Sequence, residues 1–355
     1  MISHQNIIAN VEQSLFMRNL RTASASSYEK PTFDERWLGF LPLYHAYGQL
    51  WSISAAARTL TPVFFMRSFN YKDWLRHVAT HRITHIQTAP PIVVMLAKRP
   101  ETKEYDLSSL RNILCGAAPL SKELQNEVSA KVGRGLKVVQ TWGMTEVTCS
   151  SLHVPGLMDD DSGSVGLIDP NCDMKLLDEE GKEVGDGDRG EIWVRGPNIC
   201  QGYWRNEAAT KEAFDSEGFL KTGDVAIKQK GWYRIVDRKK ELIKVKGFQV
   251  APAELEAVLL EHEDVADSAV VALQMDHEER PRAYLALKDH AKGNLKEEDI
   301  VKWMAQRVAK HKQLTGGVMF VEEVPKSPSG KIQRVIMRQW AARDAKEVGQ
   351  PKAKL

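Results

Sequence analysis

Short apolar runs alternate with amphipathic helical segments through the first part of the chain, to about residue 154. The apolar runs cover residues 37–42, 63–65 and 83–89, and helical periodicity extends over 71–80 and 120–132. Runs of this length between polar segments predict buried strands. Strands that alternate with helices favour a parallel sheet with helices on its faces, so the pattern predicts an α/β fold.

Two later regions have different patterns. Between residues 163 and 233, short strands such as 174–177 and 191–195 are separated by glycine, aspartate and proline. This pattern predicts a small antiparallel sheet or barrel. Nearer the C-terminus, Pro252 stands at the expected first position of a helix, and a second helix is expected over 298–310. These signals predict a compact α+β domain.

The changes in pattern divide the chain into three parts. We expect a large domain over residues 1–238, which combines the parallel sheet and its helices with the small antiparallel barrel. A small α+β domain is expected over 239–340, and a flexible polar tail over 341–355.

Composition excludes several classes of function. The 355 residues carry 49 Lys and Arg against 47 Asp and Glu, a formal net charge of +2, so no strong field favours nucleic acid or an anionic membrane. A hydrophobic content of 43% is too high for a disordered chain. No apolar run of about 18 residues predicts a membrane span. The 4 cysteines form no C-x-x-C pair, which argues against a zinc or thioredoxin-type site and fits a reducing compartment.

The segment Gln140–Glu146 follows a predicted strand over 136–139 and combines an aromatic, a glycine, a hydroxyl and a carboxylate. Trp142 can stack on a base, and the glycine lets a backbone approach closely. Thr145 can bond a phosphate, and Glu146 can hold Mg²⁺. A loop whose threonine caps the next helix explains the same residues, so the segment alone leaves both interpretations open.

Three later segments have related chemistry. Asp224, in Thr222-Gly223-Asp224, either forms an Asx-turn or accepts the hydroxyls of a ribose. Residues 238–246 hold one arginine and four lysines interleaved with apolar residues, which suits either a solvated face or a phosphate site. Lys331 lies on a loop stiffened by two prolines and a glycine. It is either a solvated lysine or a preorganised cation for developing negative charge.

In this order, the segments resemble the motifs of the acyl-activating, adenylate-forming (AMP-binding) enzymes. Within that family the chain is most similar to 4-coumarate–CoA ligase-like enzymes and fungal aryl- and acyl-CoA ligases, from Ser3 to about Arg338. Residues 1–238 then correspond to an AMP-binding domain and 239–340 to a mobile C-terminal domain. The resemblance rests on the segments 41–48, 116–120, 140–146, 190–197, 222–224, 236–252 and 327–331.

The resemblance implies an ATP-dependent acid–CoA ligase. A carboxylate would attack the α-phosphorus of ATP to give acyl-AMP and pyrophosphate, and the CoA thiolate would then displace AMP. Lys331 is implied as the catalytic lysine, His45 as a residue of the acyl channel, and Thr145 as the partner of the α-phosphate. Glu146 is implied as the ligand of Mg²⁺. The small domain would turn between the two half-reactions.

The resemblance also implies positions that contact ATP, the adenylate or CoA, or that form the hinge. Trp142 would replace the usual tyrosine against adenine, and Thr141 stands where glycine is usual, which would narrow the acyl pocket. The full set of implied cofactor-binding positions is Gly116, Ala117, Ala118, Gln140, Thr141, Trp142, Thr145, Asp224, Arg238, Lys240, Lys244, Lys246, Gly247 and Gln249.

One family feature is missing from the sequence as printed. A phosphate loop of the type T-S-G-T-T-G-x-P-K-G, with a subdomain ahead of it, would precede Met1-Ile2-Ser3-His4. Such a loop donates backbone N–H groups to the β- and γ-phosphates. Losing a single preorganised donor can cost about 10²–10³ in rate. We therefore expect an N-terminally truncated member whose unaided activity is open.

Two alternatives stay open at this point. An inactive remnant that binds an AMP-like ligand or a partner chain would explain the missing loop, whereas the retained Glu146, Asp224, Arg238 and Lys331 favour an enzyme. A luciferase-like adenylating oxygenase would use the same first step. The substrate of the ligase would be an aryl, phenylpropanoid or fatty acid, in secondary metabolism, an expectation at the level of the family alone.

The sequence ends in Ala353-Lys354-Leu355, a variant of the S-K-L tripeptide that the peroxisomal import receptor binds. We expect a peroxisomal location with that receptor as a partner. A solvated basic tail of a cytoplasmic protein is the alternative interpretation.

Overall fold

The computed structural model divides the chain into two compact units, Met1–Ile235 and Val236–Leu355. The predicted boundary at Arg238 lies within strand β11 (Trp232–Arg238). Ala117 and Ala118, and the tripeptide Ala353–Leu355, lie outside the described residues. The structure describes residues 1–20, 34–116, 120–133, 135–156, 158, 160, 162–275, 278–327 and 330–348.

A seven-stranded sheet forms the frame of the first unit. The first five strands along the sheet are parallel, and the last two join antiparallel. The predicted α/β fold with a parallel sheet is therefore confirmed. The order along the sheet is β2 (Val63–Phe65), β1 (Trp37–Gly39), β3 (His85–Thr88), β4 (Asn112–Cys115), β5 (Lys137–Trp142), β6 (Leu152–His153) and β7 (Leu167–Ile168).

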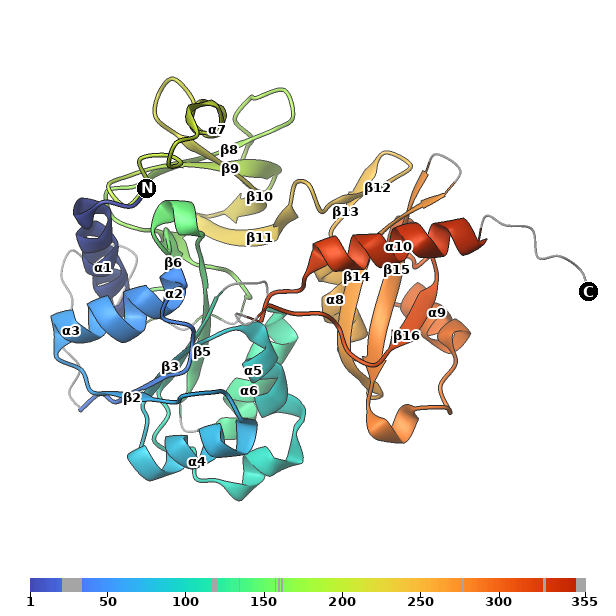
Figure 1. Cartoon of the computed structure of the whole chain (residues 1–355), viewed down its shortest axis with the longest axis horizontal. Helices are drawn as coiled ribbons and strands as arrows, with labels where there is room; N and C mark the ends of the chain where they lie inside the picture. The colour runs from blue at the N-terminus through green and yellow to red at the C-terminus, as the bar shows by residue number, and fades with distance from the viewer. Residues whose placement is uncertain are drawn as a thin grey trace, which may run out of the picture. The chain divides into compact units, whose positions relative to one another are not determined.

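Helices cover both faces of this sheet (Figure 1). Neighbouring residues of one strand contribute to core clusters on opposite faces. On β4, Ile113 packs in the cluster of α4, α5 and α6, and Leu114 packs in the cluster of α1 and η1. Because helices cover both faces, residues on both sides of the strands are buried, including polar ones such as Gln87, Thr88 and Gln140. The helices are α1 (His4–Asn19), α2 (Ala46–Gly48), the π-helix η1 (Gln49–Ala55), α3 (Ala56–Thr59), α4 (Tyr71–His81), α5 (Pro90–Lys98), η2 (Pro100–Glu104) and α6 (Lys122–Val132).

A separate four-stranded sheet follows in the first unit, where the glycine-separated strands predict a small antiparallel sheet. Its strands β8 and β10 both pair antiparallel with β9. Ile192 and Val194 of β9 are buried, and Trp193 between them is on the other face of the strand and is half-buried. The elements are η3 (Thr145–Val147), β8 (Asp173–Leu177), β9 (Arg189–Arg195), α7 (Glu207–Ala213), β10 (Leu220–Gln229) and β11, in the sheet order β11-β10-β9-β8.

The second unit is an α+β domain, as predicted. A three-stranded sheet, β14-β15-β16, has α10 on one face, where Met337 packs with Tyr284. On the other face, Leu255 of α8 and Ile300 of α9 pack with Leu285. The elements are β12 (Ile243–Val245), β13 (Phe248–Val250), α8 (Pro252–Leu259), β14 (Val265–Met275), β15 (Glu278–Leu287), η4 (Asp289–Ala291), α9 (Glu297–Ala305), η5 (Lys310–Lys312), β16 (Val318–Val321) and α10 (Arg334–Val348).

The helix expected over 298–310 is wrong in its C-terminal end, because α9 stops at Ala305. The N–H groups of Arg307 and Val308 both bond to the carbonyl of Met304. A shared carbonyl tightens the last turn and leads the chain out of the helix. Within the described ranges, no helix is long and apolar enough to cross a membrane.

The buried leucine of α4, Leu75, should contribute strongly to the stability of the first unit. We expect Leu75→Ala, at a fully buried position, to lower the free energy of unfolding by about 2–5 kcal/mol, because it removes packing and leaves a cavity. The matched control is Leu60→Ala, at a leucine that is 89% exposed, with a change within about 0.5 kcal/mol. Urea unfolding followed by tryptophan fluorescence measures both. Equal effects of the two variants would contradict the assignment of α4 to the core.

Candidate functional site

The loop after β5 is forced into a tight turn by Gly143. A Cβ atom at this position would lie 1.7 Å from the carbonyl oxygen of Cys149, so no larger residue fits. The turn continues through η3 and through Thr148, whose φ is +67°. Thr145 is consequently exposed and Glu146 half-buried, although β5 extends through Trp142, three residues beyond the predicted strand.

Trp142 and Asp224 meet, although 82 residues separate them in the chain. The indole N–H of Trp142 donates to Oδ2 of Asp224 at 2.9 Å, and each residue is 5% exposed. The rest of the indole packs in the core with Val147 and Leu152. The bond orients the Asp224 carboxylate, and it joins two motifs that the sequence presents as separate.

At Thr222-Gly223-Asp224 the backbone stays within β10, at the point where its pairing with β9 shifts register. The Thr222 hydroxyl accepts the N–H of Asp224 at 3.1 Å and donates to the carbonyl of Ile192 at 2.8 Å. Gly223 has a φ of +71°, and its N–H donates to Oε1 of Glu191 at 3.2 Å. Asp224 is therefore held from its backbone as well as from its carboxylate.

Tyr203 holds the carboxylate of Glu146. Its hydroxyl donates to Oε1 of Glu146 at 2.9 Å, and the N–H of Cys200 donates to the Glu146 carbonyl at 2.7 Å. Burial and the Glu146 carboxylate raise the pKa of Tyr203 to about 12, so the phenol stays a donor. The backbone of Tyr203 is anchored in turn by the hydroxyl of Thr210 at 2.9 Å. The two residues lie 57 positions apart, and no local pattern in the sequence identifies Tyr203.

Glu146 is a candidate ligand for a metal ion, and Cys200 lies beside it. In the described part of the chain, no group of three or more carboxylates, cysteines or histidines is placed to hold a metal ion. A single oriented carboxylate fits Mg²⁺, which commonly binds one or two carboxylates and takes its other ligands from phosphates and water. The residues present thus fit a magnesium ion that arrives with a nucleotide.

Gln140 and Thr141 shape the frame beside Gly116. The Gln140 side chain is buried and bonds to the N–H and the carbonyl of Leu120, each at 3.0 Å. Thr141 donates to the carbonyl of Leu152 at 2.7 Å. A Cβ at Gly116 would lie 3.2 Å from Cγ2 of Thr141 and 3.3 Å from the Tyr47 ring. Gln140 therefore has a structural role in the interior. Gly116 is the small residue that fits next to the Tyr47 ring and the Thr141 methyl group.

His45 begins α2 at the edge of the same region. Its Nδ1 accepts the N–H of Tyr47 at 3.2 Å, so the side chain caps the helix. The Tyr47 hydroxyl donates to the carbonyl of Leu114 at 2.7 Å. Burial raises the pKa of Tyr47 well above its ordinary value, so the phenol keeps its proton and this bond. His45 itself is half-buried.

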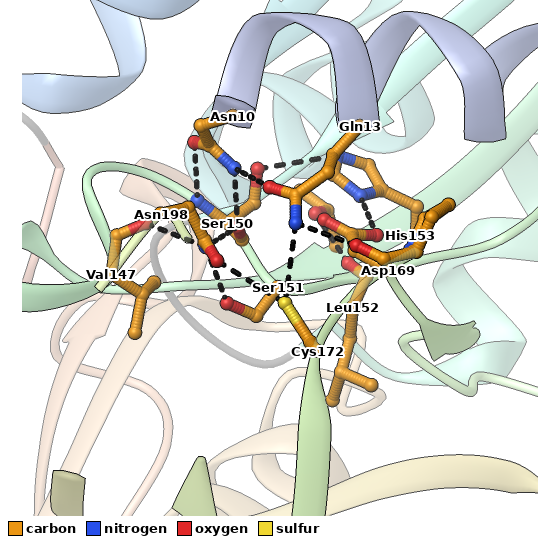
Figure 2. A network of polar contacts seen from close by, with 12 residues as sticks. Asn10, Gln13, Val147, Ser150, Ser151, Leu152, His153, Asp169, Cys172 and Asn198 are labelled. Carbon is orange, nitrogen blue, oxygen red and sulfur yellow. Dashed lines mark hydrogen bonds and ion pairs between the residues drawn. The ribbon is translucent and has the colours of Figure 1, made fainter. Parts of the chain in front are cut away.

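A network of buried amides supports the loop from beneath (Figure 2). Asn10 of α1 donates to the Ser150 carbonyl at 2.7 Å and accepts the Ser150 N–H at 3.2 Å. Asn198 donates to the same carbonyl at 3.0 Å and to the carbonyl of Val147 at 3.1 Å. Both asparagines are completely buried. The network connects α1, the segment around Asn198 after β9, and the loop that carries Thr145 and Glu146.

Ser150, His153 and Asp169 form a chain within this network (Figure 2). The Ser150 hydroxyl lies 3.2 Å from Nε2 of His153, and Nδ1 of His153 lies 2.7 Å from Oδ1 of Asp169. The order of partners matches a hydrolase triad. All three residues are at most 2% exposed, so a substrate does not reach the serine. These three hydrogen-bonded residues stabilise β6, and Ser150 does not act as a nucleophile.

None of the 4 cysteines of the chain forms a disulfide, and three of them are buried. Burial raises the pKa of the Cys115 thiol and that of Cys200. Burial and the charge of Asp169 raise the pKa of Cys172 to about 12. These thiols are therefore protonated at neutral pH.

The basic segment of the second unit forms the hairpin β12–β13. Ile243, Val245 and Val250 are buried, and Lys244 lies directly opposite Gln249 on the other face. Lys246 and Gly247 form the two-residue turn, with φ values of +48° and +85°, which is typical of a type I′ turn. The alternation predicted for this segment is confirmed.

The remaining predicted positions of the second unit lie at its surface. Arg238 and Lys240 are exposed, and Lys331 is half-buried. The two residues implied for the ribose are divided between the units, with Asp224 in the first and Arg238 in the second.

Comparison with known proteins decides the family. The model of the AMP-binding enzyme family matches residues 1–204, more than half of the chain, and the model of its C-terminal domain matches residues 254–331. The chain belongs to the AMP-binding enzyme family.

Members of this family in other organisms resemble the chain over most of its length. An acyl-CoA synthetase, ACTT5, of Alternaria alternata is 41% identical over 89% of the chain, and the probable 4-coumarate–CoA ligase 1 of Dictyostelium discoideum is 38% identical over 94%. The chain spans 56% and 59% of the length of these relatives. Among solved structures, the O-succinylbenzoate coenzyme A synthetase of Bacillus subtilis, in complex with ATP and magnesium ion, is 27% identical with a TM-score of 0.77, over 95% of this chain and 66% of that one.

The buried amides beneath the loop should be important for stability. We expect Asn10→Ala to lower the free energy of unfolding by about 1–3 kcal/mol, because it leaves the buried N–H and carbonyl of Ser150 with fewer partners. The control on the same helix is Glu12→Ala, whose side chain is 51% exposed in its ion pair with Arg58, with a change below about 1 kcal/mol. Chemical denaturation of both variants measures the change in the free energy of unfolding. A loss for Glu12→Ala as large as that for Asn10→Ala would rule out a specific role of the buried amide.

Proposed function

We propose that this chain carries the chemistry of an AMP-forming acid–CoA ligase. The observation that carries the proposal is the bond of Trp142 to Asp224, with Thr145 and Glu146 presented on the loop that follows Trp142. In this proposal Trp142 stacks on the base, Asp224 accepts from the ribose, Thr145 donates to a phosphate and Glu146 binds magnesium. Membership of the AMP-binding enzyme family and the names of the relatives support the same reaction.

In the first half-reaction, a carboxylate oxygen of the acid attacks the α-phosphorus of ATP. The new P–O bond forms as the bond to the bridging oxygen breaks, and pyrophosphate leaves. The Thr145 hydroxyl donates to an α-phosphate oxygen, and Asp224 accepts the ribose hydroxyls. Lys331 stabilises the charge that develops on the phosphoryl oxygens. A magnesium ion held by Glu146 would shield the phosphate charge from the incoming carboxylate.

In the second half-reaction, the CoA thiolate attacks the acyl carbon and AMP leaves with the C–O bonding pair. The β12–β13 turn is the part of the second unit proposed to meet CoA, because Lys246 and Gly247 stand exposed at its tip. Lys244 and Gln249, opposite each other in the hairpin, are proposed to face the adenylate. A rotation of the second unit would bring this turn to the reaction after Lys331 has left it.

We infer that the acid is an aryl, phenylpropanoid or fatty acid used in secondary metabolism. Support comes from the relatives, which are named as an acyl-CoA synthetase and a probable 4-coumarate–CoA ligase. Gly116 and Thr141 are proposed to border the acyl group, since a side chain at position 116 would press on Thr141 and on the Tyr47 ring.

The test of the function is the release of pyrophosphate by the purified 355-residue chain, given ATP, Mg²⁺ and a panel of aryl and fatty acids. Release that depends on one acid, followed by formation of its CoA thioester, supports the proposal. The same panel without Mg²⁺ serves as the control. Binding of AMP without pyrophosphate release for any acid would contradict it in favour of a nucleotide-binding module.

The two half-reactions should respond differently to the loss of Lys331. We expect Lys331→Ala to abolish acyl-AMP formation and to leave thioester formation from supplied acyl-AMP unchanged, because the ammonium acts on the phosphoryl oxygens of the first step alone. Separate assays of acyl-AMP formation and of thioester formation measure the rates of the two half-reactions. An equal loss in both would refute the role proposed for Lys331.

We also propose a peroxisomal location, supported by the final Ala353-Lys354-Leu355 of the sequence. Removal of this tripeptide from a fluorescent fusion should release a punctate signal into the cytosol, because the import receptor would lose its ligand. A fusion that keeps Ala353 but carries Lys354→Glu is the control for altered charge. Punctate fluorescence that persists without the tripeptide would exclude it as the address.

A further inference from the structure

Arg334 begins α10 three residues after Lys331, and its guanidinium is fixed on several sides. Nη1 donates to Oε1 of Glu256 and to the carbonyl of Val270, each at 2.8 Å, and Nη2 donates to Oε2 of Glu256 at 3.0 Å. The N–H of Val270 donates to the same Glu256 carboxylate at 2.8 Å. Side-chain exposure is 16% for Arg334 and 11% for Glu256. A bidentate pair of this kind is among the stronger and more directional contacts in proteins.

The backbone around Lys331 is tied to the same place. The N–H of Lys331 donates to the Ser327 hydroxyl at 3.2 Å, and the N–H of Ser327 donates to the Lys331 carbonyl at 2.8 Å. The N–H of Gln333 donates to the Pro325 carbonyl at 2.9 Å, and its side-chain amide donates to the Lys326 carbonyl at 3.0 Å. The segment therefore closes on itself, and Arg334 is the next residue along the chain that bonds to the sheet.

Acidic groups from other elements surround Arg334. Asp237 is buried and accepts the N–H groups of Arg238 at 2.7 Å and Ala253 at 3.0 Å. Burial raises the pKa of Asp237, and the positive charge of Arg334 opposes the rise. One turn further along α10, Arg338 donates to Glu241 at 2.6 Å. The first two turns of α10 thus contact both α8 and the segment from Asp237 to Glu241.

We infer that Arg334 is a positioning residue for Lys331, and that its pair with Glu256 fixes the orientation of the lysine segment on the second unit. The inference rests on the proposed function, in which Lys331 acts in acyl-AMP formation. A shift of about 1 Å in a catalytic group can cost about 10² in rate. Loosening the pair should therefore reduce the first half-reaction while leaving the second, in which Lys331 takes no part, unchanged.

A second arginine pair holds the same helix and offers a matched control. Arg282 of β15 bonds to Asp344 near the other end of α10, at 2.7 Å, and to the carbonyl of Gly316 at 2.8 Å. This pair is at least as buried as that of Arg334, with side-chain exposures of 9% and 3%. It ties α10 to the sheet ten residues beyond Arg334 and does not contact the lysine segment. We expect loss of either pair to weaken α10, whereas loss of the first alone should loosen the lysine segment, which keeps the ion pair of Lys326 with Asp267 at 2.6 Å.

The direct test is backbone amide exchange in the full 355-residue chain, read at Gly330, Lys331 and Gln333. We expect Arg334→Met to raise exchange at these amides at least about ten-fold, while Arg282→Met leaves them as in the wild type. Arg334→Lys and Glu256→Gln, which preserve volume and part of the bonding, keep the comparison possible should Arg334→Met fold poorly. Unchanged exchange at Lys331 in these variants overturns the inference.

The functional test separates the two half-reactions for the same variants. Arg334→Lys should slow acyl-AMP formation by about 10-fold to 100-fold through kcat, with little change in KM for ATP, and should keep thioester formation from supplied acyl-AMP within about two-fold. Equal slowing of both half-reactions, or the same split for Arg282→Lys, overturns the inference. If the wild-type chain forms no acyl-AMP, the proposed function fails, and the exchange experiment still decides the role of Arg334.

Discussion

The carbonyl oxygen of Ser150 accepts hydrogen bonds from two buried side-chain amides, Asn10 and Asn198. One belongs to the first helix and the other to a segment almost 190 residues later, so a single backbone group fixes the distance between them. A buried carbonyl of this kind is costly to leave without partners. The loop that turns at Gly143 and presents Thr145 and Glu146 is built on this support, and its geometry follows from the network beneath it.

Much of the fold is predictable from local pattern because strands buried on both faces and amphipathic helices leave strong periodic signals. The strand at 63–65 and the α+β nature of the C-terminal part follow from this. Local pattern fails at two element boundaries, which are decided by particular hydrogen bonds. β5 continues through Trp142 because Thr141 and Trp142 pair with His153 and Leu152 of β6, and α9 stops early because one Met304 carbonyl takes two donors.

The candidate site divides in the same way. Motif residues such as Glu146, Asp224 and Lys331 are visible in the sequence, because their chemistry and order are distinctive. Their partners are not visible: Tyr203 reaches Glu146 across 57 residues, and Arg334 reaches Glu256 across 78. Tyrosine and arginine at these positions fit many structural roles, so only the three-dimensional pairing identifies them as the groups that orient the motif residues. Gln140, in contrast, belongs to a motif, but its side-chain amide forms hydrogen bonds with the backbone of Leu120.

The burial of the cysteines has a consequence for the proposed formation of an acyl-adenylate. Mixed anhydrides of this type acylate any thiolate within reach, and the reactive form of cysteine is the thiolate. In this chain, burial keeps the thiols of Cys115, Cys172 and Cys200 protonated. Under the proposed function, this burial limits self-acylation, because the thiol of CoA meets no competing thiolate among these three side chains.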